Sequence, residues 1–374
     1  MYGYANANSG HILQQQRQPD LADLGQLTRW QDADSLFTAL GNGNTVGAIP
    51  YFLGGGASIT SSVTGFGSDQ IVSARLISAK GDLVDVAEET HPDLLWAIRG
   101  AGQFFGLVTQ LVIDAKPLSV LGNDKGVIWA GIFVFPLDRA EEVCSTMKAL
   151  MDDNRYETSG LMMVMAPPPV RQPSLVISAR LTGDPEDAQE AFKPLYDLQP
   201  IVANGAEVPI QNASDARAAM GAKGDFKRFG VVGLRRFEAD SFMKTISLWK
   251  EMVAECPDAI NTAFNFQWDS RPVKPPRFDS AMSHHDIRYW QYVHTFKSRA
   301  CSRNNLIWHT DPRSRSKVVT RSGQNLADLV DFQNGTRAGP IEHRYRGTER
   351  LARLRKLKQA WDPTGVFTDQ LLPY

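Results

Sequence analysis

Apolar and polar residues alternate in short runs through the first third of the chain, and this pattern predicts strands. Residues 71–77 and 83–86 alternate on either side of a turn-forming Lys-Gly-Asp sequence at 80–82, which is typical of a β-hairpin. Residues 107–113 have the same β-forming composition. A helix is expected over residues 92–100, because proline stands at its start and glycine at its end.

Strand and helix patterns are mixed in the following two hundred residues, without a steady strand–helix–strand rhythm. Strands are predicted over residues 127–135, 161–165, 175–181, 229–234 and 262–268. Helices are predicted over residues 137–151 and 240–253, and a further one from Asp184-Pro185. This order favours an antiparallel sheet with helices on one face. A last, basic helix is expected to be capped by Thr348 and to end at Trp361, before Asp362-Pro363.

The N-terminal region has weaker patterns. Residues 1–25 are polar and have little periodicity, so we expect little regular structure there. The sequence Asp32-Ala33-Asp34 is a typical N-cap sequence for a short helix through Leu36 and Leu40, which Gly41 would end. Together the patterns predict an α+β protein of two domains, joined near residues 117–126, with the C-terminal segment returning to the first domain.

Charge and composition exclude several classes of function. A formal net charge of -1 argues against nucleic-acid binding, which needs a basic surface. No apolar run approaches the roughly 18 residues of a membrane span. The first residues do not form a signal peptide, so we expect a cytoplasmic protein, or a secreted one if the natural N-terminus lies further upstream. The three cysteines are far apart and are expected to be small buried residues rather than zinc ligands.

A run of glycines at residues 53–58, LGGGAS, is the most informative sequence in the chain. Consecutive glycines let backbone N–H groups converge on the anionic oxygens of a diphosphate. The run is neither a Walker loop nor a Rossmann fingerprint, because it lacks the Gly-Lys-Ser/Thr and the GxGxxG patterns. Taken alone, a run of glycines is more often a plain turn than a diphosphate loop.

The surroundings of this loop extend the pattern. Residues 65–74, 91–100 and 102–109 follow as GFGSDQIVSA, HPDLLWAIRG and GQFFGLVT, and the chain ends with YRG, RLARLRKLK and WDPTGVF. In this order and spacing, the sequence from about Trp30 onward resembles the FAD-linked oxidases of the vanillyl-alcohol-oxidase (PCMH) type. It is most similar to the berberine-bridge-like oxidases and to the fungal 6-hydroxynicotine-oxidase-like enzymes.

The resemblance implies three parts. Residues 1–120 would be the later part of a PCMH-type FAD-binding domain, residues 121–335 an antiparallel-sheet substrate domain, and residues 336–374 a C-terminal berberine-bridge segment on the FAD domain. The family's N-terminal segment, with its Gly-Gly-His loop, has no counterpart here, since Ser9-Gly10-His11 lies too close to Trp30. The family's second covalent anchor, a cysteine before the glycine loop, is also absent. FAD is therefore expected to bind non-covalently, with fewer donors, each contributing about 1.5–3 kcal/mol.

Site residues carried over from the family group around the cofactor. The diphosphate would be approached by Gly54, Gly55, Gly56 and Ser58, and the loop beneath the cofactor would be shaped by Gly65 and Asp69. The flavin or adenine would touch the backbone of Gly106 and Val108. The isoalloxazine ring would lie near Asn334. Two of these have plainer alternatives: Asp69 as the cap of a turn, and Asn334 as an exposed loop residue.

The catalytic base is harder to assign. Some relatives carry a carboxylate base on the strand that corresponds to residues 264–268, where this chain has Gln267, and Asp269 follows shortly after. Tyr289 and Tyr292 are the candidate phenolic acid/base groups, although an aromatic run also serves packing. No metal site is expected, because the adjacent histidines at 284 and 285 would face opposite sides of a strand.

These observations favour an FAD-dependent oxidoreductase of secondary metabolism, which transfers a hydride from a small molecule to flavin and is reoxidised by oxygen. Two alternatives stay open. One is a flavin-free member of the family that catalyses isomerisation or cyclisation, and the other is an inactive truncated fragment.

Overall fold

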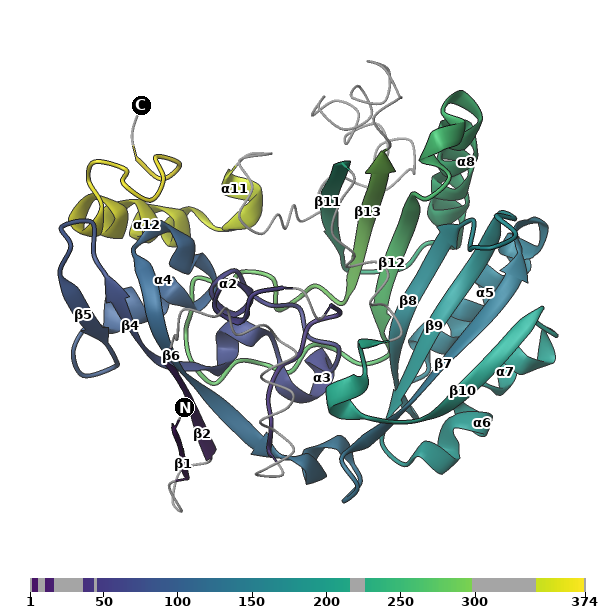
Figure 1. Ribbon diagram of the computed structural model, residues 1–374, viewed down its shortest axis with the longest axis horizontal. Helices are drawn as coiled ribbons and strands as arrows, with labels where there is room; N and C mark the ends of the chain where they lie inside the picture. The colour runs from purple at the N-terminus through teal and green to yellow at the C-terminus, as the bar shows by residue number, and fades with distance from the viewer. Residues whose placement is uncertain are drawn as a thin grey trace.

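The structure is a computed structural model, and it describes residues 2–5, 11–16, 36–43, 46–215, 226–297 and 341–372. Two β-sheets stand beside each other, each with helices packed on it (Figure 1). Residues 118–126 connect the last strand of the first sheet to the first strand of the second. The molecule is thus the α+β protein expected from the sequence.

The first sheet is antiparallel and is built around β6 (Leu107–Pro117), in the order β1-β2-β6-β4-β5, with β3 paired to the far end of β6. The predicted hairpin is confirmed at its expected bounds, as β4 (Ile71–Ile77) pairs with β5 (Leu83–Val86). The other strands are β1 (Tyr2–Ala5), β2 (His11–Gln16) and β3 (Leu36–Phe37).

Helices α2 (Ala48–Leu53) and α4 (Pro92–Ala101) pack on this sheet in one hydrophobic core. The predicted helix at 92–100 is confirmed. Gly100 leaves helical geometry with φ 111°, and a Cβ there would lie 2.9 Å from the backbone nitrogen of Met282. Only glycine allows this close approach. Shorter helical turns are α3 (Ser61–Thr64), η1 (Gly67–Gln70), η2 (Gly102–Phe104) and η3 (Leu118–Leu121).

The second sheet is an antiparallel sheet in the order β10-β7-β9-β8-β12-β13-β11. Its strands are β7 (Val127–Pro136), β8 (Glu157–Met165), β9 (Ser174–Thr182), β10 (Val202–Pro209), β11 (Phe226–Leu234), β12 (Ala263–Asp269) and β13 (Tyr289–Lys297). Its helices are α5 (Ala140–Asp152), α6 (Ala188–Ala191), α7 (Lys193–Asp197) and α8 (Ala239–Glu255), with short turns η4 (Leu137–Arg139), η5 (Pro185–Asp187), η6 (Ile210–Asn212) and η8 (Pro257–Ala259).

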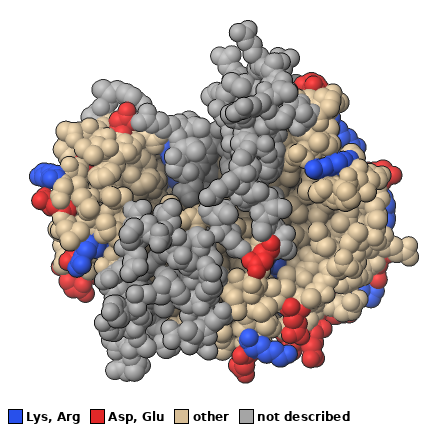
Figure 2. Space-filling view, in the orientation of Figure 1, with Lys and Arg blue, Asp and Glu red and all other residues tan. Residues whose placement is uncertain are grey.

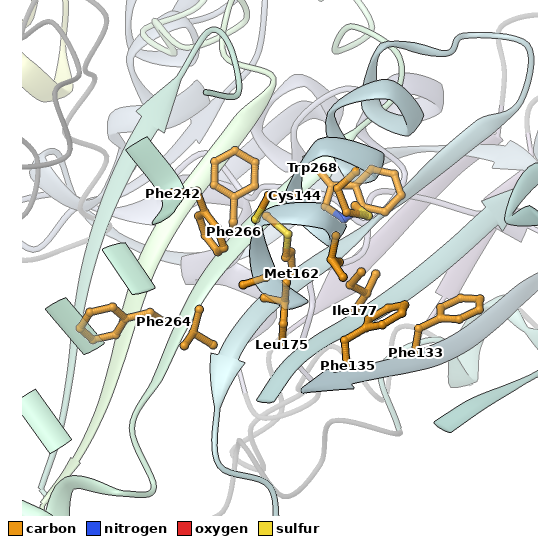
Figure 3. Packing of buried hydrophobic residues seen from close by; sticks show 14 of the residues in the cluster. Phe133, Phe135, Cys144, Met162, Leu175, Ile177, Phe242, Phe264, Phe266 and Trp268 are labelled. Carbon is orange, nitrogen blue, oxygen red and sulfur yellow. The ribbon is translucent and has the colours of Figure 1, made fainter. Parts of the chain in front are cut away.

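Alternation along the strands places one side-chain set under these helices. Phe133 and Phe135 of β7, with Phe264 and Phe266 of β12, belong to the large core of this half, which also contains buried residues of α5 and α8 (Figure 3). The residues between them point to the opposite face, because side chains alternate along a strand. The helices lie on one side only, as predicted (Figure 1). The other side of the sheet is called the open face below.

The C-terminal segment packs on the first half of the molecule. It contains α11 (Ile341–Arg344) and α12 (Thr348–Trp361), and Leu351 and Leu354 of α12 join the core of the first sheet. Lys358 of α12 donates a hydrogen bond to the Phe104 carbonyl. The segment therefore packs on the first sheet and its helices.

Four local expectations are corrected. Leu36 starts a β-bridge to β6 rather than a helix, because pairing with Pro117 and Lys116 buries Leu36 and Phe37 together. The polar N-terminal region contributes β1 and β2 to the first sheet. Gly347, not Thr348, occupies the N-cap position of α12. Cys144 is free and buried as expected, whereas Cys256 is disulfide-bonded.

The surface carries charges of both signs. On the face drawn in Figure 2, Lys and Arg side chains are interspersed with Asp and Glu over the described residues. Within those residues, none of the helices has the length and apolar character to span a bilayer.

Candidate functional site

The glycine loop begins where α2 ends. Gly55 and Gly56 have φ values of 113° and 70°, which L-residues rarely adopt. Their carbonyl oxygens accept hydrogen bonds from the backbone N–H groups of Ser68 (2.9 Å) and Gly67 (2.7 Å). The loop is therefore held against η1 through its carbonyls.

The amides of the loop are left available. Gly55 and Gly56 are buried, yet no acceptor among the described residues reaches the N–H of either, or that of Ala57. Buried backbone donors are almost always paired. Successive unpaired N–H groups in a glycine turn form a cradle for anionic oxygens. The loop thus fits the diphosphate of FAD.

Ser58 shapes this loop with its side chain. Its buried hydroxyl accepts the N–H groups of Leu40 (3.3 Å) and Thr60 (3.1 Å), and it lies 3.2 Å from the Thr64 hydroxyl. The hydroxyl is therefore occupied within the protein. Any contact of Ser58 with a diphosphate would have to come from its backbone.

Asp69 both caps a turn and holds the loop that follows the glycines. Its carboxylate accepts the Phe66 N–H (2.9 Å), which caps the turn η1. The same carboxylate lies 2.9 and 3.1 Å from Nε2 of His285, in the second half of the chain. A Cβ on Gly65 (φ 80°) would meet Asp69 Oδ2 at 2.9 Å, which explains a glycine there. Asp69 thus ties the glycine loop to the segment before β13.

Two of the remaining cofactor candidates lie at the start of β6. Gly106 and Val108 lie where β6 pairs with β4; Val108 is buried, and a Cβ on Gly106 would meet Leu76 at 2.7 Å. Asn334 lies outside the described residues.

The open face of the second sheet turns toward the first domain and carries polar residues in cross-strand rows. In one row Arg180 of β9 pairs with Ser159 of β8, which pairs with Asp269 of β12. In the next row Gln267 pairs with Trp290 of β13. The rows meet the first domain directly, because Ser159 donates to the Ile59 carbonyl (3.4 Å).

The two candidate tyrosines lie on opposite faces. Tyr289 is 2% exposed in the helix-side core, with its ring 5.6 Å from Phe266, and burial raises its pKa to about 12. Its environment is that of a packing residue. Tyr292 lies on the open face and packs against the small cluster of Phe66 and Trp290, which Ala57 of the glycine loop also contacts. Of the two, only Tyr292 is near the cofactor loop.

Asp269 is a titratable group that the sequence places near Gln267 but does not mark as a site residue. It is buried on the open face, and the Ser61 hydroxyl of α3 donates to its Oδ2 (3.0 Å). Burial raises the pKa of Asp269 to about 7, against the smaller lowering effect of Ser61. Strand alternation places Asp269 beside Gln267, but only the fold shows that α3 covers it.

A second group missed from the sequence joins three distant segments. Arg180 donates to Oδ1 of Asn42 (3.0 Å), and Nδ2 of Asn42 donates to Oε1 of Gln267 (2.8 Å). No local pattern marks Asn42, which lies in the loop after β3. These contacts place polar groups from both halves of the molecule over the open face.

The adjacent histidines do not converge on a common ligand. His285 binds Asp69, whereas His284 is buried with its ring 6.0 Å from that of Trp290, and burial lowers its pKa to about 3. Asp286 is bound by Arg235 (2.8 Å) and by Arg346.

No family model matches the chain. It is 24% identical to the FAD-linked oxidoreductase hasG of Aspergillus fumigatus, over 92% of this chain and 75% of that protein. It is 25% identical to the FAD-linked oxidoreductase fogF of Aspergillus ruber, over the same shares.

Solved oxidases have the same fold. A xylooligosaccharide oxidase from Myceliophthora thermophila superposes with a TM-score of 0.78 at 19% identity, over 100% of this chain and 80% of that chain. The 6-hydroxy-D-nicotine oxidase of Arthrobacter nicotinovorans superposes with a TM-score of 0.73 at 19% identity, over 91% and 74%. The expected α+β fold and the resemblance to FAD-linked oxidases of the berberine-bridge-like type are confirmed by these matches.

Proposed function

We propose that this chain, which resembles the fungal FAD-linked oxidoreductases in sequence and shares the fold of the berberine-bridge-like oxidases, is an FAD-dependent oxidoreductase that oxidises a small metabolite. One observation carries the proposal: Gly55, Gly56 and Ala57 offer three successive amides without an acceptor among the described residues. Such a cradle fits a diphosphate and has no evident structural purpose without an anion.

The residues proposed to hold FAD start from this loop. Gly55, Gly56 and Ala57 would bind the diphosphate through their N–H groups, while Gly65 and Asp69 keep the loop in place. The N–H of Gly54, which the family resemblance also suggests, already donates to the Pro50 carbonyl (3.0 Å). The binding is proposed to be non-covalent. The proposed contacts of Gly106, Val108 and Asn334 rest on the family resemblance alone. FAD, when bound, supplies the acceptor for the hydride that the oxidation removes.

The proton is proposed to go to Asp269. A carboxylate with a pKa of about 7 is present in both protonation states near neutral pH, which suits a general base. The Ser61 hydroxyl holds Oδ2 in place. Gln267 precedes it on the same face but has no basic atom, so Asp269 takes the role that Gln267 cannot.

Tyr292 is proposed to contact the substrate at the other end of the same face. It lies one row beyond Gln267, opposite Asn265 of β12. It also borders the apolar cluster of Leu161, Met163 and Val176. A small molecule with an apolar body would therefore rest between Tyr292 and the polar row. Oxygen is the proposed electron acceptor, in keeping with the structural relatives named as oxidases.

The disulfide at Cys256 bears on where the protein works. Disulfides persist mainly in oxidising compartments and are rare in the cytosol. It favours a secreted protein over the cytoplasmic one that the N-terminal sequence suggests.

The test is the visible absorption spectrum of the purified chain, with and without added FAD. We expect flavin bands that co-elute with the protein and are released by denaturation. Gly55→Ala, at φ 113°, should weaken FAD binding, whereas Gly183→Ala, at φ 133° and with open space around it, should not.

A folded, colourless chain that binds no added FAD would overturn the proposal and leave a flavin-free isomerase or cyclase. A cooperative thermal melt, followed by far-UV circular dichroism, establishes that the chain is folded. Absence of a melt would instead identify an inactive fragment.

A further inference from the structure

The open face holds a buried arginine that no carboxylate neutralises. Arg180 is 3% exposed, in the middle of the second sheet. Its hydrogen bond goes to the neutral side chain of Asn42, and it forms no ion pair within the described part of the chain. A buried guanidinium without an anion is strongly unfavourable.

Asp269 does not meet this need. It lies in the same cross-strand row, but Ser159 of β8 stands between them. Two strand spacings separate their backbones by about 10 Å. The Asp269 carboxylate is bound by Ser61 from the other side. Arg180 therefore keeps an unmatched positive charge beside the proposed reaction site.

The hydrogen bonds around Arg180 have a single consistent direction. Because a guanidinium can only donate, Asn42 must present its oxygen to Arg180 and its amide nitrogen to Gln267. Gln267 then accepts through Oε1, which leaves its Nε2 as a donor without an acceptor among the described residues. Arg180 and Gln267 thus offer donors on either side of Asn42.

We propose that Arg180 and Gln267 bind a carboxylate of the substrate, and that Asn42 is the positioning residue that orients Gln267. The inference rests on the proposed function in one respect, that the molecule bound here is the one oxidised. Next to the polar row, Leu161 pairs with Gln267, and Met163 and Val176 follow in the next row. The substrate class is therefore a small carboxylic acid with an apolar body.

Benzoate is the probe, and benzamide is its neutral match. Dissociation constants are measured on the full-length chain by ligand-observed NMR, which requires neither turnover nor bound flavin. Wild type is expected to bind benzoate at least tenfold more tightly than benzamide. Arg180→Gln should remove this preference, and Arg180→Lys should retain part of it. Arg155→Gln, at an exposed arginine, makes the same change of net charge and should leave the preference for benzoate over benzamide intact.

A second variant keeps the test decisive if Arg180→Gln does not fold. Asn42→Asp places a carboxylate beside Arg180, so it should raise the melting temperature and abolish benzoate binding. The proposal is overturned if wild type binds benzoate no better than benzamide, or if Arg180→Gln or Asn42→Asp binds benzoate as wild type does. A chain that binds benzoate but no FAD would contradict the proposed oxidoreductase function and leave the carboxylate site intact.

Discussion

The ion pair between Lys358 and Asp362 should be the most sensitive point of the C-terminal segment. Both side chains are 0% exposed, and their spacing of four residues places them at the end of α12. Lys358 also donates to the Phe104 carbonyl at 2.7 Å, in the turn η2 of the first domain. Asp362 accepts the backbone N–H groups of Val366 (2.7 Å) and Phe367 (3.0 Å). The pair thus joins α12, the residues after it and the first domain.

The two partners are not equivalent. Asp362→Ala leaves a buried ammonium with one carbonyl acceptor and removes the acceptor of two amides. Breaking a buried pair costs about 3–5 kcal/mol, and each orphaned amide adds about 1–3 kcal/mol if it stays dry. We expect Asp362→Ala to lower the free energy of unfolding by roughly 5 kcal/mol. Lys358→Met keeps the apolar stem and leaves the carboxylate with its two amide donors, so we expect a loss of roughly 3 kcal/mol.

Urea unfolding, followed by tryptophan fluorescence, measures both losses. Burial would raise the pKa of Asp362, but the Lys358 bond and the two amides outweigh it, and the net shift is downward. Its stabilising contribution is therefore present above the unfolded pKa and lost as pH falls through the folded value. The difference in the free energy of unfolding between wild type and Asp362→Ala should therefore become smaller in acid.

An exposed pair with the same spacing is the control. Lys193 and Asp197 are 2.6 Å apart on α7, and both are exposed. Asp197→Ala should cause no measurable loss, because solvent screens exposed pairs. The reasoning fails if Asp362→Ala behaves like this control, or if Lys358→Met is the more damaging change.

Three further outcomes are expected. Gly100→Ala should destabilise the chain by about 2 kcal/mol more than Gly81→Ala, since both have positive φ but only Gly100 faces backbone within 3 Å; equal losses in thermal melts would contradict this. Alkylation of the unfolded, unreduced chain should label Cys144 and spare Cys256, and a labelled Cys256 peptide in the mass spectrum would disprove the bond. Because the pKa of Asp269 is about 7 in the folded state and its ordinary value is 3.8, the folded state binds more protons between these two values, so stability should fall as pH rises through this window. Asp269→Asn should flatten that slope in urea titrations, and an unchanged slope would refute the burial argument.

The elements that the sequence predicts well are those specified by local patterns. The hairpin of β4 and β5 is set by alternation around a tight turn, and both of its strands match the structure. Leu36 departs from the predicted helix because a capping sequence is a weak signal, and pairing with β6, about 80 residues later in the chain, overrides it. The same limit applies to the site. The glycine loop is visible as a motif, but the contact of Asn42 with Gln267 spans 225 residues and has no local signature.

The segment after the glycine loop explains why the two parts of the proposed site act as one. Ile59 accepts from Ser159, Ser61 donates to Asp269, and Asp69 pairs with His285. Within about ten residues, the chain that shapes the cofactor loop also buries the proposed base. The raised pKa of Asp269 has burial as its largest cause, so it depends on this contact. A change that detaches the segment should therefore weaken FAD binding and return the pKa of Asp269 toward its ordinary range together.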